Sequence, residues 1–262
     1  MDWVRSVTFS LDSQLIASGS NNKTVRLWDA ATGKCKQILE VKIGWVSVVA
    51  LSTDGRWLAS ASNKGTVRLW DTTIGKYKQT LESHNSQVNA MAFSADGHQL
   101  ASASSDGTVR LWVVATGRCE QELTNRFYPV TAVAFSADGH QLAYASRDKI
   151  VRLWANTATG EWEETFKVDT FIQSLCFSKD GQYLQTDKGL LDLQMYPHQV
   201  DSRRGICING DWARRDGQDL LYLPRHYRPT CSAFHDNLMV LGQASGEVVF
   251  VKFDFSKVDM TT

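Results

Sequence analysis

Histidine and cysteine are the residues of this chain that could bind a metal ion or supply a nucleophile and its base, and they are scattered. The 262 residues include six histidines and five cysteines, with no C-x-x-C pair and no His–Cys set at the spacing of a zinc site. His98 and His140 occupy matching turns, whereas His198, His226 and His235 stand singly. Because no nucleophile lies near a recognisable base, the sequence predicts no catalytic residue, no metal site and no small-molecule cofactor. A hydrolase is the remote alternative.

The charge balance gives no sign of a nucleic-acid or membrane partner. The chain has 28 basic and 28 acidic residues, so its formal net charge is zero. The pairs Arg203-Arg204 and Arg214-Arg215 are typical of solvated turns, and nucleic-acid binding is kept only as a remote alternative. No apolar run approaches the roughly 20 residues of a membrane helix, and no secretion signal is recognisable. We expect a cytoplasmic protein, with the nucleus as the alternative location.

The elements that must position any site are repeated along the chain. Trp28, Trp70, Trp112 and Trp154 fall at every forty-second residue, each at the end of a copy of the stretch 106–112. A fixed period of this size indicates repeated structural units. Within each copy, apolar valine and leucine alternate with polar residues, which predicts a half-buried strand and not a helix.

Each repeat contains four strand signals. In the third repeat, a strand at 88–93, an Asp-Gly turn, a strand at 99–103 and a tight turn at 105–107 lead to a third strand that ends at Trp112, and a fourth follows at 117–123. Four short antiparallel strands in about 40 residues make one propeller blade. The predicted fold class is all-β, a β-propeller of four-stranded antiparallel blades. We expect about six blades, with seven blades or an incomplete ring as alternatives.

The chain is predicted to be a single domain over residues 1–262. Regular repeats cover 1–194, an irregular segment with three of the four prolines covers 195–229, a final degenerate blade covers 230–254, and a tail covers 255–262. The last blade shows no fourth strand of its own. Either the tail supplies one, or the segment 195–224 supplies one, or the chain is a fragment with an exposed edge. We favour the fragment.

Two cysteines occupy matching places in the repeats. Cys35 and Cys119 lie two periods apart, and Tyr77 lies midway between them. An odd number of cysteines without paired spacing argues against a disulfide framework. We therefore expect both cysteines at equivalent positions in the core.

The repeats resemble the WD-repeat family. The resemblance is carried by Trp28-Asp29, Trp70-Asp71 and the altered pairs Trp112-Val113 and Trp154-Ala155, with the Leu-Ala-Ser strands before them. In that family a histidine before the first strand, a serine or threonine in the second, an aspartate in the tight turn and the tryptophan form a hydrogen-bonded tetrad. In this chain the third repeat alone can build it, and the other blades must depend on apolar packing. The tetrad residues are His84, Asp106, Trp112 and either Ser102 or Ser104.

The resemblance also implies which residues point to one rim of the propeller, its top face. They are the residue just before the first strand's valine, the residue just after it, and the residue before the tight-turn aspartate. Since protein-binding hot spots favour tryptophan and arginine, we expect a non-catalytic interaction scaffold that binds a protein or peptide there. The candidates are Trp3, Arg5, Trp45, Asn89, Arg147, Phe171 and Gln173. The alternative for Trp3 and Trp45 is that they only cap blade edges.

The C-terminal part carries a narrower resemblance. The stretches Leu220–Pro229 and Leu241–Gly246 look like the end of the long fungal signalling proteins, including the vegetative-incompatibility group, that carry a nucleotide-binding NACHT module before their WD repeats. This resemblance implies the ligand-sensing or partner-sensing part of such a protein. The alternative is a free-standing WD-repeat adaptor. The chain has no G-x-x-x-x-G-K-[ST] run, so NTPase activity is not implied for it.

Overall fold

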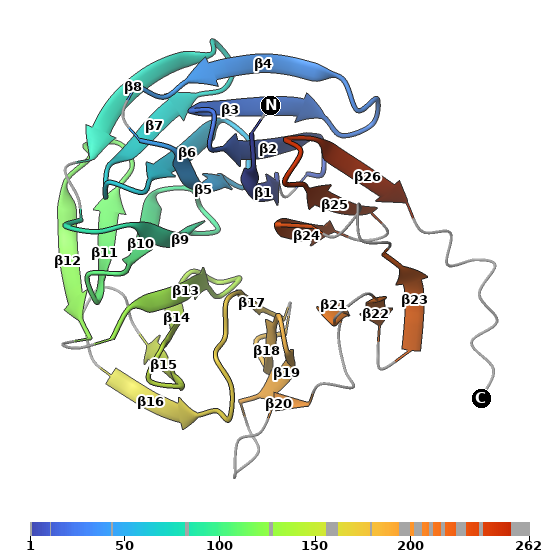
Figure 1. Cartoon of the computed structure of the whole chain (residues 1–262). Coiled ribbons are helices and arrows are strands. Elements are labelled where there is room, and N and C mark those ends of the chain that lie inside the picture. Colours follow the sequence, from blue (N-terminus) through green and yellow to red (C-terminus); the bar gives the residue numbers. More distant parts are fainter. Residues whose placement is uncertain are drawn as a thin grey trace.

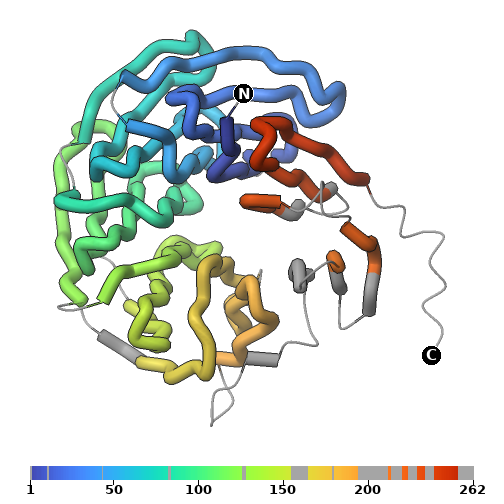
Figure 2. Tube along the Cα trace, in the orientation of Figure 1, coloured from blue at the N-terminus to red at the C-terminus, as the bar shows by residue number. Residues whose placement is uncertain are grey.

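The described part of the chain is built of β-strands and turns. The computed structural model describes residues 2–10, 12–42, 44–81, 84–125, 128–155, 162–178, 180–193, 200–201, 206–209, 212–215, 218–223, 229–235 and 238–252. No helix occurs among them. The sheets are arranged side by side around a common centre (Figures 1 and 2), which confirms the predicted all-β propeller.

The first four sheets follow the tryptophan repeat. Each has four antiparallel strands in chain order. The first holds β1 (Val4–Phe9), β2 (Leu15–Ser20), β3 (Thr24–Asp29) and β4 (Cys35–Glu40), and the second holds β5 (Val46–Leu51), β6 (Trp57–Ser62), β7 (Val67–Asp71) and β8 (Lys76–Leu81). The third holds β9 (Val88–Phe93), β10 (Gln99–Ser104), β11 (Thr108–Val113) and β12 (Cys119–Thr124), and the fourth holds β13 (Val130–Phe135), β14 (Gln141–Ser146), β15 (Ile150–Ala155) and β16 (Trp162–Lys167).

Three more sheets complete the described part of the ring, which brings the number of sheets there to seven. The fifth holds β17 (Leu175–Phe177), β18 (Tyr183–Thr186), β19 (Gly189–Asp192) and β20 (Val200–Asp201). The sixth holds β21 (Ile206–Asn209), β22 (Trp212–Arg215) and β23 (Gln218–Tyr222), and the seventh holds β24 (Cys231–His235), β25 (Leu238–Gly242) and β26 (Val248–Lys252). The described residues of the segment 195–229 thus contribute β20 and the whole sixth sheet, and none of their strands joins the seventh. The tail 255–262 lies outside the described residues.

The repeat tryptophans lie between neighbouring blades. Trp70 packs with residues of the first and second sheets, Trp112 with the second and third, and Trp154 with the third and fourth. Only 6%, 2% and 4% of their surfaces are exposed. Trp28 is less buried and meets Phe250 of β26 edge to face at 6.3 Å. Because each ring fills the gap towards the preceding blade, the repeat fixes how blades stack as well as how each one folds.

The first sheet meets the seventh directly. The backbone N–H of Val4 donates to the carbonyl of Gln243 at 3.0 Å, and the Thr230 hydroxyl donates to the Val4 carbonyl. A side chain at Gly242 would stand 2.5 Å from a methyl group of Val4, so the close approach of β1 and β25 depends on this glycine. Hydrogen bonds and close packing therefore join the two ends of the described ring (Figure 1).

The prediction that Cys35 and Cys119 lie in the core is wrong. Both cysteines are exposed at the starts of β4 and β12, and Tyr77 at the matching place is 50% exposed. The fourth strand of each of these sheets is its outermost strand. Its buried residue lies near the end of the strand, at Leu39 in β4, Leu81 in β8 and Leu123 in β12. Repetition correctly predicts that the two cysteines are equivalent, but it does not say which side of an edge strand faces the core.

Candidate functional site

The candidate residues converge on one rim of the ring. Because the strands of a sheet run antiparallel, the start of each first strand lies beside the turn between the second and third strands. The N–H of Asn21 donates to the Trp3 carbonyl at 2.8 Å, and that of Arg147 donates to the Pro129 carbonyl at 3.0 Å. We call this rim the top face, formed by these turns and by the loops that enter each first strand. The bottom face carries the other two turns of each blade.

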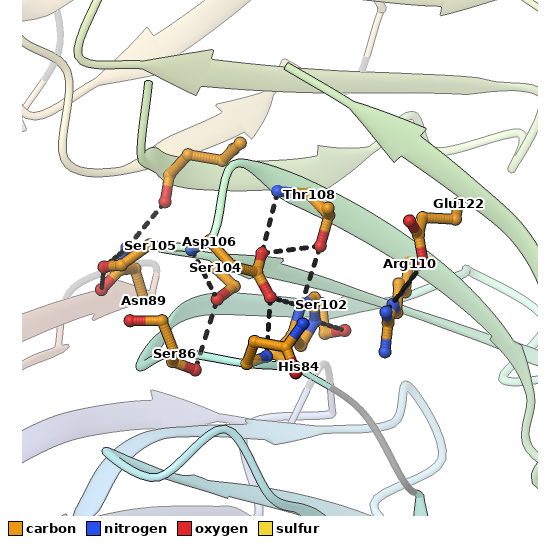
Figure 3. Close-up of polar contacts among 12 residues, drawn as sticks. His84, Ser86, Asn89, Ser102, Ser104, Ser105, Asp106, Thr108, Arg110 and Glu122 are labelled. Carbon is orange, nitrogen blue, oxygen red and sulfur yellow. Dashed lines mark hydrogen bonds and ion pairs between the residues drawn. The ribbon is translucent and has the colours of Figure 1, made fainter. Parts of the chain in front are cut away.

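The third blade contains a connected chain of buried polar groups (Figure 3). The indole N–H of Trp112 donates to Ser102 Oγ at 2.9 Å. Ser102 Oγ in turn lies 2.7 Å from His84 Nε2. His84 Nδ1 lies 3.1 Å from a carboxylate oxygen of Asp106 and donates to it. Ser102 thus takes the serine position of the tetrad, while the neighbouring Ser104 hydroxyl contacts the Ser86 carbonyl at 3.3 Å. The chain of bonds fastens the loop before β9 to the turn before β11.

The pKa of Asp106 reflects this network. Burial raises the pKa, but hydrogen bonds from His84, from the Thr108 hydroxyl and from the Asn85 N–H outweigh it and hold the pKa well below its ordinary value. The carboxylate therefore stays charged, which keeps it an acceptor for all three donors.

The other tryptophan-bearing blades keep only part of the network. Trp28 and Trp70 donate to Ser18 and Ser60 at 2.9 and 2.8 Å. In the fourth blade the serine is replaced by Tyr144, which is fully buried and whose pKa burial raises. Asp148 there pairs with Arg152 at 2.6 Å. Lys42 and Val168 stand at the histidine position of the second and fifth blades, and Arg126 of the fourth lies outside the described residues.

The residue after the first strand's valine occupies a β-bulge in each of the first four sheets. In the third sheet Val88 pairs with Ser104 and Ala90 with Ala103, which leaves Asn89 as the extra residue. The matching extra residues are Arg5, Ser47 and Thr131. A bulge turns a side chain out of the regular ladder, so these side chains can reach groups beyond their own sheet. Ser47 and Thr131 also donate to carbonyls of their own sheets, at Ala61 (3.2 Å) and Ala145 (3.1 Å).

Three of the bulge residues fasten one blade to the next. Ser47 donates to the Val88 carbonyl at 2.8 Å, Asn89 to the Val130 carbonyl at 2.8 Å, and Thr131 to the Ile172 carbonyl at 2.6 Å. The amide of Asn89 also donates to Ser105 at 2.9 Å. The sequence predicted Asn89 as a partner-binding residue, and in the structure its side chain is half-buried and holds the third and fourth blades together.

Arg5 differs from the other bulge residues. Its side chain is exposed, its Nε donates to Asn21 at 2.9 Å, and its guanidinium lies 4.7 Å from the centre of the Trp3 ring. Gln173 is exposed as well, and its backbone N–H donates to Asp187 at 2.8 Å. Arg5 therefore presents a charge beside an aromatic ring, an arrangement common in protein interfaces.

Four aromatic side chains are half-exposed on the top face. Trp3, Trp45 and Phe171 are 45%, 41% and 48% exposed. Tyr128, which the sequence analysis missed, is 49% exposed. In the fourth blade Pro129 takes the position matching Trp3, and the aromatic residue lies one place earlier. A search for aromatic residues one place to either side of the repeat position would have found it.

Two basic residues flank the aromatic group. Arg147 is exposed in the turn before β15, and Lys149 of the same turn places its ammonium 5.6 Å from the centre of the Phe171 ring. Lys149 was also missed, because the sequence does not show that this turn faces the loop of the next blade. The contact joins the fourth and fifth blades into one surface.

The histidine, cysteine and acidic residues of the described ranges do not gather into a metal-binding group. No group of three or more histidine, cysteine, aspartate or glutamate residues among them could hold a metal ion. His198, His226 and the pair Arg203-Arg204 lie outside the described residues. No helix in the described ranges is long and apolar enough to cross a membrane.

Comparison with known families gives one match. The family described as "WD domain, G-beta repeat" matches residues 1–29, 33–71, 75–113 and 117–155, which together make up more than half of the chain. A search of curated proteins gave no match. The matched segments each end within one or two residues of a repeat tryptophan, so the family pattern and the blade pattern share one period.

Proposed function

The chain belongs to the WD-repeat family, and from that premise we propose that its top face recognises a protein or peptide partner. Propellers of this family generally bind protein partners and are typically non-catalytic. The fold alone does not say where a partner binds, so the proposal depends on the surface.

The observation that carries the proposal is the group of aromatic side chains on one face. Trp3, Trp45, Tyr128 and Phe171 each keep between 41% and 49% of their surface exposed, although buried apolar residues follow one or two positions later in the chain. Large aromatic residues exposed together are typical of interaction sites, and tryptophan and tyrosine are prominent among binding hot spots. Arg5 and Arg147 beside them supply polar contacts.

The competing account is that Trp3 and Trp45 only cap blade edges. Trp45 makes a backbone hydrogen bond to Asn63 at 3.1 Å, which would fix its loop whether or not a partner binds. Binding and stability measurements on the same variant separate the two accounts. An edge cap would reduce stability when removed, whereas a contact residue would reduce binding at unchanged stability.

The test uses Trp45→Ala with Ile74→Ala as its matched control. Ile74 is 62% exposed in a turn of the bottom face of the same blade. Proteins captured by the purified wild-type chain would be quantified by mass spectrometry and compared with those captured by each variant. We expect Trp45→Ala to weaken capture of the same set by about tenfold or more, as hot-spot truncations do, and Ile74→Ala to leave it unchanged. Equal capture by all three folded proteins would remove the top face from consideration.

The narrower proposal places this propeller in a signalling protein of the fungal NACHT type, as its sensing part. Its support is the sequence of residues 220–229 and 241–246, of which 224–228 lie outside the described residues. The alternative is a free-standing adaptor. Sequencing the genomic region upstream of the first codon tests this, because an in-frame nucleotide-binding module supports the first and a stop codon the second.

We also propose a cytoplasmic location, with the nucleus as the alternative. Its support is that Cys35, Cys119, Cys176 and Cys231 carry free thiols, as proteins in reducing compartments do. Fluorescence microscopy of a tagged full-length chain checks the location, and a secreted pool with oxidised cysteines would contradict it.

A further inference from the structure

The neutral net charge of the chain conceals a group of unpaired basic residues on the top face. The top face carries six exposed basic residues, one at the start of β1 and five in its loops and turns, and among the described residues none of them lies within ion-pair distance of a carboxylate. They are Arg5, Lys23, Lys42, Lys64, Arg147 and Lys149. Their charges therefore face solvent.

Three carboxylates of the top face are engaged internally. Asp106 pairs with His84, Asp148 with Arg152 at 2.6 Å, and Asp187 with Lys188 at 3.1 Å. Asp187 also accepts hydrogen bonds from the backbone N–H groups of residues 173 and 174. These three acids hold turns in place and offer little charge to a ligand, whereas the six basic residues are free to meet one.

The bottom face carries a row of carboxylates together with exposed basic residues such as Lys34, Arg56 and Arg118. In five consecutive blades an aspartate occupies the same place in the turn between the first and second strands, and the serine two residues earlier donates its hydroxyl to it. Those hydrogen bonds hold the pKa of four of these carboxyls, at 12, 96, 138 and 180, below the ordinary value. The five residues are Asp12, Asp54, Asp96, Asp138 and Asp180.

Two aromatic rings of the top face already carry a cation. The Arg5 guanidinium lies 4.7 Å from the centre of the Trp3 ring, and the Lys149 ammonium lies 5.6 Å from that of Phe171. A cationic ligand would have to displace these charges to reach the ring faces. A carboxylate could instead bind the same cations while its neighbouring apolar side chains contact Trp45 or Tyr128.

We infer that the top face binds an acidic peptide segment of its partner, one in which carboxylates alternate with apolar or aromatic side chains. The inference rests on the proposed function and adds the chemistry of the partner. The complementary charges would speed association and reject basic partners.

The same basic and aromatic surface would be expected to bind nucleic acid only if its positive charge were continuous. Glu40, Asp169 and Glu247 are exposed on this face and interrupt it. Duplex DNA presents a phosphate charge about every 1.7 Å, so each of these carboxylates would lie against a phosphate-bearing backbone. Separate basic residues between aromatic rings suit a short peptide better.

The experiment selects binders from a random peptide library displayed on phage, using the immobilised full chain. The net charge of the enriched sequences is scored, and one enriched peptide and a labelled oligothymidine are titrated by fluorescence anisotropy. The test variant is Arg147→Glu with Lys149→Gly, since glycine already occupies the matching turn position at Gly65 and Gly107. Its control is Arg118→Glu with Lys34→Gly on the bottom face, where both residues are exposed.

We expect enriched peptides with a clear excess of aspartate and glutamate. Their affinity should fall about tenfold or more in the top-face variant and by less than about twofold in the bottom-face control. It should also fall when salt is raised from about 50 to about 200 mM.

Three results would overturn the inference, and they separate it from the proposed function. Enriched peptides that need Trp45 but are neutral or basic would refute the acidic partner and leave the proposed function standing. If Trp45→Ala leaves the binding of the enriched peptides unchanged, the acidic partner and the proposed function of the top face are both refuted. If oligothymidine binds more tightly than any enriched peptide, and the top-face variant no longer binds it, the top face is a nucleic-acid surface.

Discussion

The hydrogen bonds of the repeat tryptophans allow one chemical change to be compared in three blades. Ser102→Ala, Ser60→Ala and Ser18→Ala each delete one hydroxyl at the same place in β10, β6 and β2. In the third blade the hydroxyl serves both Trp112 and His84, in the second only Trp70, and in the first only Trp28. Any difference between the variants therefore reflects the number and burial of the partners left behind.

The expected losses follow from burial. Ser102→Ala leaves the Trp112 indole N–H and His84 Nε2 without a partner at positions 2% and 7% exposed. A buried polar group left unsatisfied costs about 1–3 kcal/mol, so the variant should lose roughly 2–5 kcal/mol of unfolding free energy. Ser60→Ala leaves one buried N–H and should lose about 1–2 kcal/mol. Ser18→Ala should lose less than about 1 kcal/mol, because water can reach the less buried Trp28.

Urea unfolding followed by tryptophan fluorescence measures these losses as shifts of the midpoint at constant slope. The predicted order of loss is Ser102→Ala, then Ser60→Ala, then Ser18→Ala. In a Trp112→Phe background, where the indole N–H is absent, Ser102→Ala should cost about 1 kcal/mol less than in the wild type. Equal shifts for Ser102→Ala and Ser18→Ala would refute the reasoning, because they would show that the His84 connection adds nothing.

Three further predictions concern single contacts. The pKa of Asp106 in the folded state lies below its ordinary value of 3.8, so its stabilising contribution is complete above that value and is lost as the pH falls towards the folded pKa. Asp106→Asn should therefore lose less stability than the wild type between about pH 5 and about pH 2, as measured by acid titrations followed by circular dichroism. Parallel titration curves for the two proteins would contradict this. Thr131→Val should cost about 1 kcal/mol in urea melts, because it removes the hydrogen bond to the carbonyl of Ile172; an unchanged midpoint would show that this bond between blades is dispensable. Lys149→Gly should change stability by less than about 1 kcal/mol, because glycine accepts the positive φ of this turn position. Gly65→Lys should destabilise by more than about 2 kcal/mol, because a Cβ at Gly65 would stand 2.0 Å from the His84 carbonyl oxygen. Equal thermal midpoints for the two variants would be inconsistent with the turn geometry.

Much of the architecture can be predicted from the sequence because the same strand and turn signals recur in each repeat. The strand that ends at Trp112, the turn that needs Gly107 and the alternation of buried and exposed residues recur with one period, so a single local rule predicts blade after blade. The resemblance to the WD-repeat family named His84, Asp106 and Trp112 of the tetrad and left its serine as Ser102 or Ser104, and the hydrogen bonds of the structure select Ser102. Prediction was weaker where copies diverge. The sixth sheet lies in a segment expected to be irregular, and its Trp212 does not continue the 42-residue period of the repeat tryptophans.

What the sequence determined by itself is therefore local: strands, turns, the spacing of the tryptophans and the residues that vary at the rim. What only the tertiary structure decided is which of those variable residues are free to meet a partner. Asn89 and Thr131 donate hydrogen bonds to the next blade, while Tyr128 and Lys149, which the sequence analysis did not select, belong to the top face. The physical reason is that contacts between blades join residues about one whole repeat apart, and a periodic pattern specifies the fold of each unit but not the geometry with which neighbouring units meet.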